Sequence, residues 1–116
     1  MEQNLKKTHR YNATLIRVVD GDTIDAMIDL GFDIWVKKRI RLFGINAPES
    51  RTRDLEEKKS GLSSKKKLTE LLEDAGGKFI LASEGVGKFG RCLGVIYIGE
   101  ININDLLLKE GYAEKY

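Results

Sequence analysis

TLIRVVDGDTIDAMIDLGFDIWVKKRIRLF, residues 14–43, contains three apolar segments separated by two turns that carry glycine. In the second and third segments apolar and polar side chains alternate with a period of two, which is typical of half-buried strands. The predicted strands span residues 14–19, 24–30 and 34–43. Because the connections between them are short, the three strands are expected to form an antiparallel meander.

The region after this meander is predicted to be a loop followed by a helix. Residues 44–60 are polar and contain the single proline, Pro48, so they are interpreted as a loop. Apolar side chains then recur at helical spacing as far as Gly76-Gly77, which is expected to end the helix. Ser60 or Ser63 is expected to cap its N-terminus.

The remaining segments complete the predicted fold. Residues 78–83 and 92–98 are interpreted as two further strands, and Asn104 and Gly111 as the N-cap and C-cap of a helix over 105–110. Three strands, a helix, two strands and a helix indicate a mainly β, α+β fold. This order is that of a five-stranded OB-fold barrel. The fold alone does not specify a function.

Composition limits the class of protein. A chain of 116 residues, here 1–116, is expected to form a single domain. Its 41% hydrophobic and 33% charged residues are ordinary for a globular protein, and it has no apolar run long enough to suggest a membrane partner. Cys92 is the only cysteine, which excludes an internal disulfide. The N-terminus lacks a signal-peptide pattern, so an intracellular location is favoured unless a leader was removed.

The charges are segregated along the chain, although the net charge is only +2. Acidic residues gather in 20–33, and basic residues gather in 37–41, 51–53 and 58–67. Such segregation suits an anionic substrate next to a cation. Solvated charged faces are the alternative interpretation of each run by itself.

Three short segments carry the candidate chemistry. In the first, VDGDT, Asp20 and Asp22 flank Gly21, so two carboxylates can converge on an oxygen-preferring cation. An ordinary Asp-Gly turn is the alternative. An EF-hand is a poor match, because the stretch from Asp20 has no glycine at position six and has Gly31 at the place of the bidentate glutamate.

The second segment, RLFGINAPE, places an amide and a carboxylate just beyond a strand. Asn46 and Glu49 are three residues apart, with Pro48 stiffening the backbone between them. Arg41 offers a planar fork of donors that matches phosphate oxygens. A capped turn with a surface arginine is the alternative. The third segment, KFGR, carries Lys88 and Arg91 on a glycine-containing loop, and an exposed hairpin tip is the alternative there.

Taken together, the three segments resemble the staphylococcal nuclease (thermonuclease) family. In that family an Asp-Gly-Asp-Thr turn, a strand exit with Arg-Leu and Pro-Glu, and a Tyr-Gly-Arg loop follow in this order on a five-stranded OB barrel. The resemblance covers about residues 15–113. It implies a calcium-dependent endonuclease, a hydrolase that cleaves phosphodiester bonds of DNA or RNA, single-stranded or frayed, and leaves 3′-phosphates.

The resemblance implies metal-binding roles for four residues. Asp22 would be a direct calcium ligand, and Asn46 would occupy the position of the second side-chain ligand. The backbone carbonyl of Ala47 would supply the next oxygen. Asp20 would lie just outside these ligands and order the waters of the cation.

The resemblance also implies the catalytic and substrate-binding residues. Glu49 would hold the attacking water and take its proton. Arg41 and Arg91 would bind the scissile phosphate and offset its developing charge. Lys88 would add a phosphate contact, and the ring of Phe89 would offer a face for a nucleotide to stack on.

The chain departs from the family pattern at three places. Asn46 stands where the family commonly has aspartate, which removes one negative charge from the expected calcium site. Phe89 replaces the usual tyrosine and lacks its hydroxyl. The chain ends soon after its last predicted helix, so the usual C-terminal third helix of the family is not expected within residues 1–116.

Two other classes of function compete with the nuclease. One is a catalytically silent nuclease-like module that binds nucleic acid, and such modules typically lose the acidic and arginine positions that Asp22, Arg41, Glu49 and Arg91 fill here. The other is a plain single-strand-binding OB domain. That class uses several stacking aromatics along a groove, whereas only 8% of these residues are aromatic. Both comparisons favour the enzyme.

Overall fold

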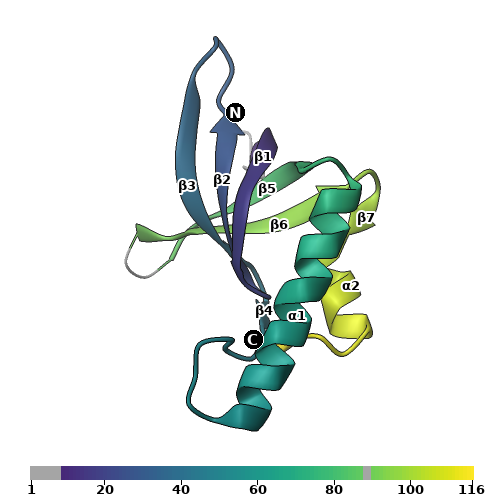
Figure 1. Ribbon diagram of the computed structural model, residues 1–116. Helices are drawn as coiled ribbons and strands as arrows, with labels where there is room; N and C mark the ends of the chain where they lie inside the picture. The colour runs from purple at the N-terminus through teal and green to yellow at the C-terminus, as the bar shows by residue number, and fades with distance from the viewer. Residues whose placement is uncertain (1–8, 88–89) are drawn as a thin grey trace, which may run out of the picture.

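Five strands form a closed barrel in the computed structural model, which describes residues 9–87 and 90–116 (Figure 1). The barrel strands are β1 (His9–Asp20), β2 (Thr23–Asp29), β3 (Trp35–Leu42), β5 (Lys78–Val86) and β6 (Cys92–Ile98). They are paired in the order β3-β2-β1-β5-β6, and a parallel pairing of β3 with β6 closes the barrel. The predicted mainly β, OB-type α+β fold is confirmed.

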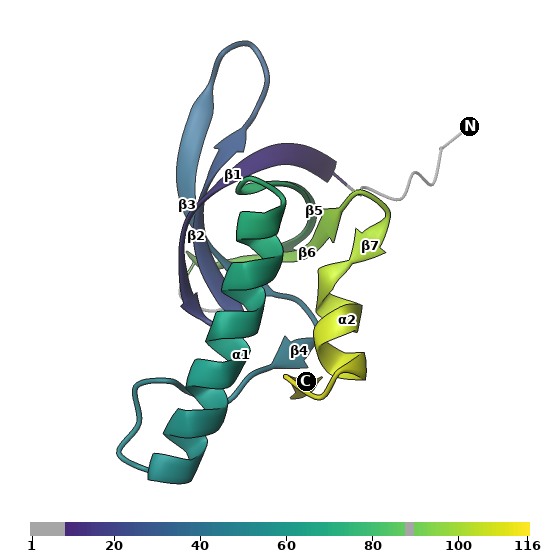
Figure 2. The same ribbon diagram turned by 45° about the vertical axis from the view of Figure 1, so that its right-hand side comes forward.

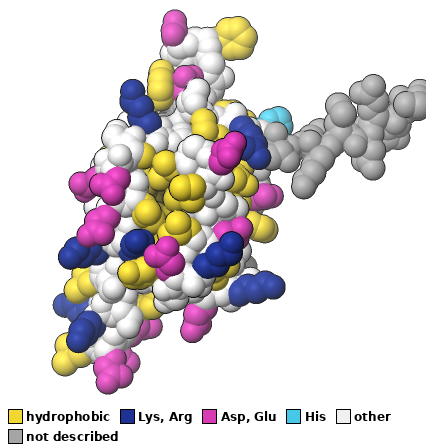
Figure 3. Space-filling model, turned by 90° about the vertical axis from the view of Figure 1, so that its right-hand side faces the viewer, with side chains coloured by type: hydrophobic (Ala, Val, Ile, Leu, Met, Phe, Trp, Pro, Cys, Tyr) yellow, Lys and Arg dark blue, Asp and Glu magenta, His cyan; other side chains and the backbone are white. Residues whose placement is uncertain are grey.

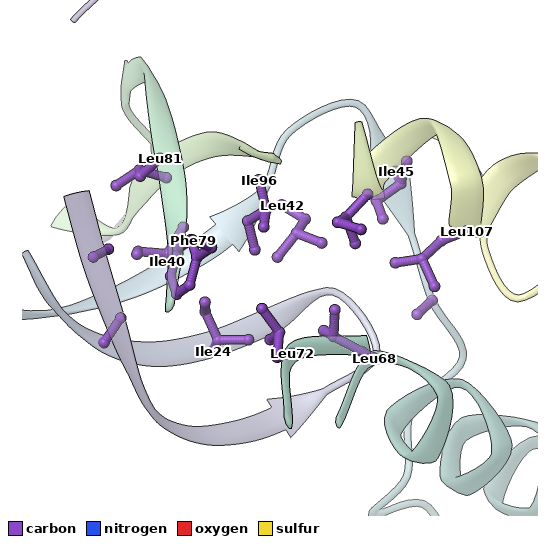
Figure 4. Close-up of a cluster of buried hydrophobic side chains, with 14 of the residues drawn as sticks. Ile24, Ile40, Leu42, Ile45, Leu68, Leu72, Phe79, Leu81, Ile96 and Leu107 are labelled. Carbon is purple, nitrogen blue, oxygen red and sulfur yellow. The ribbon is translucent and has the colours of Figure 1, made fainter. Parts of the chain in front are cut away.

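The core fills the barrel and continues under both helices. Ile24 and Ile40 are cross-strand partners on β2 and β3, and both are fully buried, as the alternation of these strands predicts. Figure 4 shows that their side chains lie in one cluster with leucines from two helices. Leu68 and Leu72 come from α1 (Leu55–Asp74), and Leu107 comes from α2 (Ile103–Lys109). This packing fixes both helices against the barrel.

Helix α1 begins earlier than the sequence analysis expects. Its N-cap is Asp54, whose carboxylate accepts hydrogen bonds from two backbone N–H groups of the first turn. The predicted caps Ser60 and Ser63 are wrong, because both lie inside the helix, and the predicted loop ends before Leu55. The N-terminal half of α1 projects beyond the end of the barrel (Figures 1 and 2).

The N-cap predicted for the second helix is also wrong. Asn102 caps α2, and its side chain accepts a hydrogen bond from the N–H of Asp105. Asn104 is buried instead: its amide accepts from the N–H of Ile96 and donates to the carbonyl of Phe43. It therefore joins α2 to β6 and to the residue that follows β3. The C-cap of α2 is Glu110 and not the predicted Gly111, which follows directly with φ of +79°.

Two short strands connect the C-terminus to the segment after β3. β4 (Ile45–Asn46) pairs antiparallel with β8 (Glu114–Lys115), and the N–H of Tyr116 donates to the carbonyl of Gly44. Another short strand, β7 (Ile101–Asn102), follows β6 after a tight turn and pairs antiparallel with it. The C-terminal residues thus brace the backbone that carries Asn46.

The hairpin between β2 and β3 projects from the barrel (Figures 1 and 2). Its tip is exposed and apolar, with Leu30, Phe32 and Ile34 open to solvent. β3 pairs with β6 only over Ile40–Leu42, so within the described residues its outer edge is unpaired from Trp35 to Arg39.

Among the helices described here, none combines the length and the apolar character that a membrane crossing requires.

Candidate functional site

The turn between β1 and β2 holds Asp22 in a fixed orientation. Asp22 is 7% exposed, and its carboxylate accepts hydrogen bonds from Thr23 Oγ1 and from the N–H of Ala47, each at 2.8 Å. Gly21 lets this turn approach α1 closely, because a Cβ there would lie 2.6 Å from the Cβ of Ser64. The turn, the segment after β4 and α1 therefore meet at Asp22.

Arg41 links the two side chains that the sequence analysis assigns to a cation. Its Nη1 lies 3.2 Å from Asp22 Oδ2, and its Nη2 donates to Asn46 Oδ1 at 3.1 Å. Nη1 also donates to the carbonyl of Ile45, and the guanidinium lies over the ring of Tyr116, 5.2 Å from its centroid. The β1–β2 turn, β4 and the C-terminal residue thus converge at one guanidinium on β3.

Asp20 is tied to the loop that carries Glu49. Ser50 is buried and donates a short hydrogen bond from its hydroxyl to Asp20 Oδ1, and its N–H approaches the same oxygen at 3.4 Å. The backbone of Glu49 and Ser50 packs directly on Gly61 of α1. The Glu49 side chain itself is exposed. Helix α1 therefore supports this loop and leaves the carboxylate of Glu49 open to a ligand.

The surface on one side of Arg41 is acidic. Asn46, Ala47, Pro48 and Glu49 line a depression of about 580 Å³ together with four further acids. These acids are Asp54, Glu56, Glu57 and Glu114. Their negative potential attracts a cation and repels a polyanion.

The surface on the other side of Arg41 is basic and partly apolar. Arg41 and Arg91 line a separate pocket of about 290 Å³, with Phe43, Leu93 and Tyr116 among its walls. The Nε of Arg91 is buried and has no hydrogen-bond partner among the described residues. Because two guanidinium groups line this pocket, it suits an anionic group that accepts hydrogen bonds. The predictions for Lys88 and Phe89 lie outside the described residues.

A second charged cluster lies further along the same strands. Asp25 on β2 accepts from Arg39 Nε on β3 at 2.8 Å and from Arg17 Nε on β1 at 2.9 Å. The bond from Arg39, supported by Arg17, outweighs burial and lowers the pKa of Asp25 to about 2. In return, Asp25 raises the pKa of Arg39. The carboxylate holds both guanidinium groups on the sheet surface.

The donor atoms at the candidate cation site suit calcium in their chemistry. Asp22, Asn46 and the carbonyl of Ala47 offer carboxylate, amide and carbonyl oxygens, the ligands that calcium prefers. The side-chain oxygens of Asp22 and Asn46 lie 3.2 and 3.1 Å from two nitrogens of one guanidinium, so they face a common positive charge. Within residues 9–87 and 90–116, His, Cys, Asp and Glu form no metal-binding group of three or more. A cation here would depend on the amide and carbonyl oxygens as well.

Several residues at this site were not found from the sequence. Ser50, Gly61 and Tyr116 reach it through contacts between distant segments, so no local pattern indicates them. Thr23 belongs to the quoted VDGDT segment, but its bond to Asp22 was not expected. Asp54 could have been found, because an aspartate with glutamates two and three residues later is a common helix start.

Relatives among known proteins include three that are described as uncharacterised. The chain is 28% identical to a protein of Bacillus anthracis over 97% of its own length and 50% of the relative. It is 30% identical to a Haemophilus influenzae protein described as an uncharacterised endonuclease, over 88% of this chain and 51% of that protein. It is 29% identical to a protein of Methanocaldococcus jannaschii, over 94% of this chain and 61% of that protein. The chain thus spans about half to three fifths of their length.

A family model supplies the assignment. The model of staphylococcal nuclease homologues matches residues 39–116, which is more than half of the chain. The match includes Arg41, Asn46, Glu49 and Arg91, and it starts after Asp22. Together with the OB-type barrel, this match confirms the resemblance found in the sequence. The chain belongs to the staphylococcal nuclease family.

Proposed function

We propose that this chain is a calcium-dependent nuclease that hydrolyses phosphodiester bonds in single-stranded or frayed DNA and RNA. The observation that carries the proposal is the position of Arg41. Its guanidinium contacts Asp22 and Asn46 on the acidic side and shares a pocket with Arg91 on the other. A phosphate bound at Arg41 would therefore lie between a cation site and a second arginine.

The reaction needs a nucleophile, cationic donors and a proton acceptor at one phosphorus. Water attacks the phosphorus as Glu49 takes its proton, and the bond to the 5′ oxygen breaks. The departing oxygen takes up a proton to become a 5′-hydroxyl, and the phosphate stays on the 3′ oxygen. Arg41 and Arg91 donate to the oxygens on which charge develops. Each such donor is worth about 2.7–4 kcal/mol in comparable sites.

The cation would be held by oxygen ligands on the acidic side of the site. Asp22, Asn46 and the carbonyl of Ala47 would bind it, and Asp20 would order its waters from the position fixed by Ser50. When bound, calcium supplies a Lewis acid next to the phosphate oxygens. The acids around Glu49 add negative potential that favours the cation. Asn46 contributes no charge, so affinity is lower than with two ligand carboxylates.

The alternative function is a nuclease-like module that binds nucleic acid without cleaving it. Such a module would need the basic pocket but would have no use for an exposed carboxylate beside the candidate cation ligands. Here Glu49 is exposed and lines the same depression as Asn46 and Ala47, and α1 supports its backbone. This arrangement favours catalysis over binding alone.

Incubation with end-labelled single-stranded DNA and RNA tests the proposal. We expect cleavage in millimolar calcium and none in excess chelator, with products that a 3′-phosphatase converts to extendable ends. A Glu49→Gln variant, which keeps the side-chain shape, should bind the strand and cleave it far more slowly. Intact polymers at millimolar calcium, with binding retained, would support the silent module instead.

A further inference from the structure

One face of β3 carries a row of side chains that begins at Arg41. Side chains two residues apart on a strand point to the same face, so Trp35, Lys37 and Arg39 share a face with Arg41. Ile40 and Leu42 point into the core instead. With about 3.3 Å per residue, the row from Arg41 to Trp35 is ~20 Å long. OB folds engage roughly 4–16 nucleotides, so this length fits a short single strand.

The middle of the row is positive and held in place. Arg39 and Arg17 flank Asp25, and these three charges sum to one positive charge. The arginine side chains are 45% and 63% exposed while the carboxylate is almost fully buried, so the cluster presents guanidinium N–H groups to solvent. Groups already held in place lose less entropy when a phosphate binds. Lys37 adds an exposed cation on the same face.

The far end of the row carries an aromatic ring beside a second pocket. Trp35 is 48% exposed, although burial is the usual state of so large an apolar side chain. It lines a pocket of about 410 Å³ together with Tyr97 and Lys78. Asp29, its cross-strand partner, accepts a hydrogen bond from Gly31 N and so belongs to the hairpin turn. An exposed ring beside a cation is the pair that stacks a base and holds its phosphate.

The charge on the rest of the surface favours the row on β3 as the path of a bound polyanion. The depression on the other side of Arg41 is lined by five acids and would repel phosphates. Figure 3 shows the side of the molecule that is on the right in Figure 1, away from β3. There, basic and acidic side chains are interspersed, without a continuous basic area. The row on β3 is therefore positively charged and begins at Arg41 of the candidate site.

We propose that the β3 row, Arg41-Arg39-Lys37-Trp35, is a binding track that holds single-stranded nucleic acid on one side of the scissile phosphate. The proposal rests on the nuclease function proposed above and extends it to substrate length. The rival explanation is that charged side chains on an unpaired edge strand only prevent pairing with other chains. That explanation accounts for Lys37 but leaves the exposed Trp35 and the Arg17-Asp25-Arg39 cluster without a role.

Tryptophan fluorescence tests the track directly, because Trp35 is the only tryptophan in the chain. Oligothymidylates of two, six and twelve nucleotides are titrated into the protein in excess chelator, so that the strands stay intact. We expect saturable quenching by the six- and twelve-residue strands, weakened by salt, and little quenching by the dinucleotide. Duplex DNA of the same length should quench less, since its bases are already stacked.

Variants then separate the track from its rival. Lys37→Glu should weaken binding of the twelve-residue strand about tenfold and lower its salt slope by at least the roughly 0.7 that one single-strand phosphate contact contributes. Trp35→Ala, followed with a labelled strand, should weaken it roughly tenfold to a hundredfold. Lys66→Glu on the exposed face of α1 is the charge-matched control and should have a smaller effect.

The outcomes distinguish the two proposals. Quenching without cleavage in calcium would keep the track and overturn the nuclease. Cleavage without quenching, together with equal strand binding by Lys37→Glu and Lys66→Glu, would overturn the track. Lys37 would then serve only to keep the edge of β3 from pairing with other chains. Equal quenching by the two- and twelve-residue strands would also overturn it, because one nucleotide would then account for all the binding.

Discussion

Gly61→Ala tests how helix α1 positions the loop of Glu49. A Cβ on Gly61 would lie 2.6 Å from Ser50 N and closer still to the carbonyl group of Glu49, whereas ordinary contacts start at 3.4 Å. Both sides are backbone, so the loop must move away from the helix by about 1 Å. A misplacement of that size at a catalytic group can lower the rate about a hundredfold.

The effect of Gly61→Ala on stability should be much smaller than its effect on rate. Overpacking costs about 1–3 kcal/mol. The replacement of a helical glycine by alanine returns about 1 kcal/mol. The net loss is therefore about 0–2 kcal/mol, and the core contacts of Leu68 and Leu72 are untouched.

Turnover of a single-stranded substrate and urea unfolding are measured on the same preparations of this variant. Leu62→Ala, an exposed change on the same helix, is the control and should retain the wild-type turnover. Wild-type turnover in a folded Gly61→Ala protein would show that the loop of Glu49 does not need the close contact with α1. The close approach of α1 would then have no bearing on Glu49.

Three further predictions follow from the site. Asn46→Asp should lower the half-saturating calcium concentration by roughly one to two decades, because two ligand carboxylates bind calcium more tightly than one; superimposable calcium titrations of activity would place residue 46 outside the ligands. Asp25→Asn should lower the free energy of unfolding at pH 7 by about 1 kcal/mol. This is less than the full pKa shift implies, because solvent screens the two exposed arginines. Since the pKa of Asp25 is lowered to about 2, this difference should be full above pH 4 and vanish as the pH falls to 2, as urea unfolding at several pH values would show. Ser50→Ala should lower the free energy of unfolding by about 1–3 kcal/mol, because Asp20 loses the hydroxyl that donates to it. An unchanged urea unfolding curve would show that this hydrogen bond does not stabilise the fold.

The barrel could be predicted from the sequence because its strands alternate clearly. Ile24, Ala26 and Ile28 lie on the buried face of β2, and their spacing of two residues is visible without a structure. The start of α1 could not be found in this way. Its first half contacts the protein through Gly61 and Ser64, whose small side chains give no hydrophobic period. The missed signal was the polar cap at its N-terminus.

The candidate site was predictable where it consists of short motifs. Asp22, Arg41 and Asn46 all stand in these motifs, and the structure brings the three together. That Arg41 joins the other two could not be predicted, because contacts between strands depend on their register. Asn104 was misassigned for a related reason. A buried asparagine and a capping asparagine look alike in sequence, and only the fold shows which one meets backbone groups of other strands.

The central claim is that the arginine between the acidic and basic sides of the site acts on the scissile phosphate. The most direct test is the turnover of a calcium-activated cleavage reaction in Arg41→Lys compared with Arg53→Lys, which changes an exposed loop arginine in the same way. Lysine keeps the charge but loses the planar fork. We expect a loss on the order of a hundredfold for Arg41→Lys and wild-type turnover for Arg53→Lys. Equal turnover in the two variants would mean that Arg41 is only a structural bridge between Asp22 and Asn46.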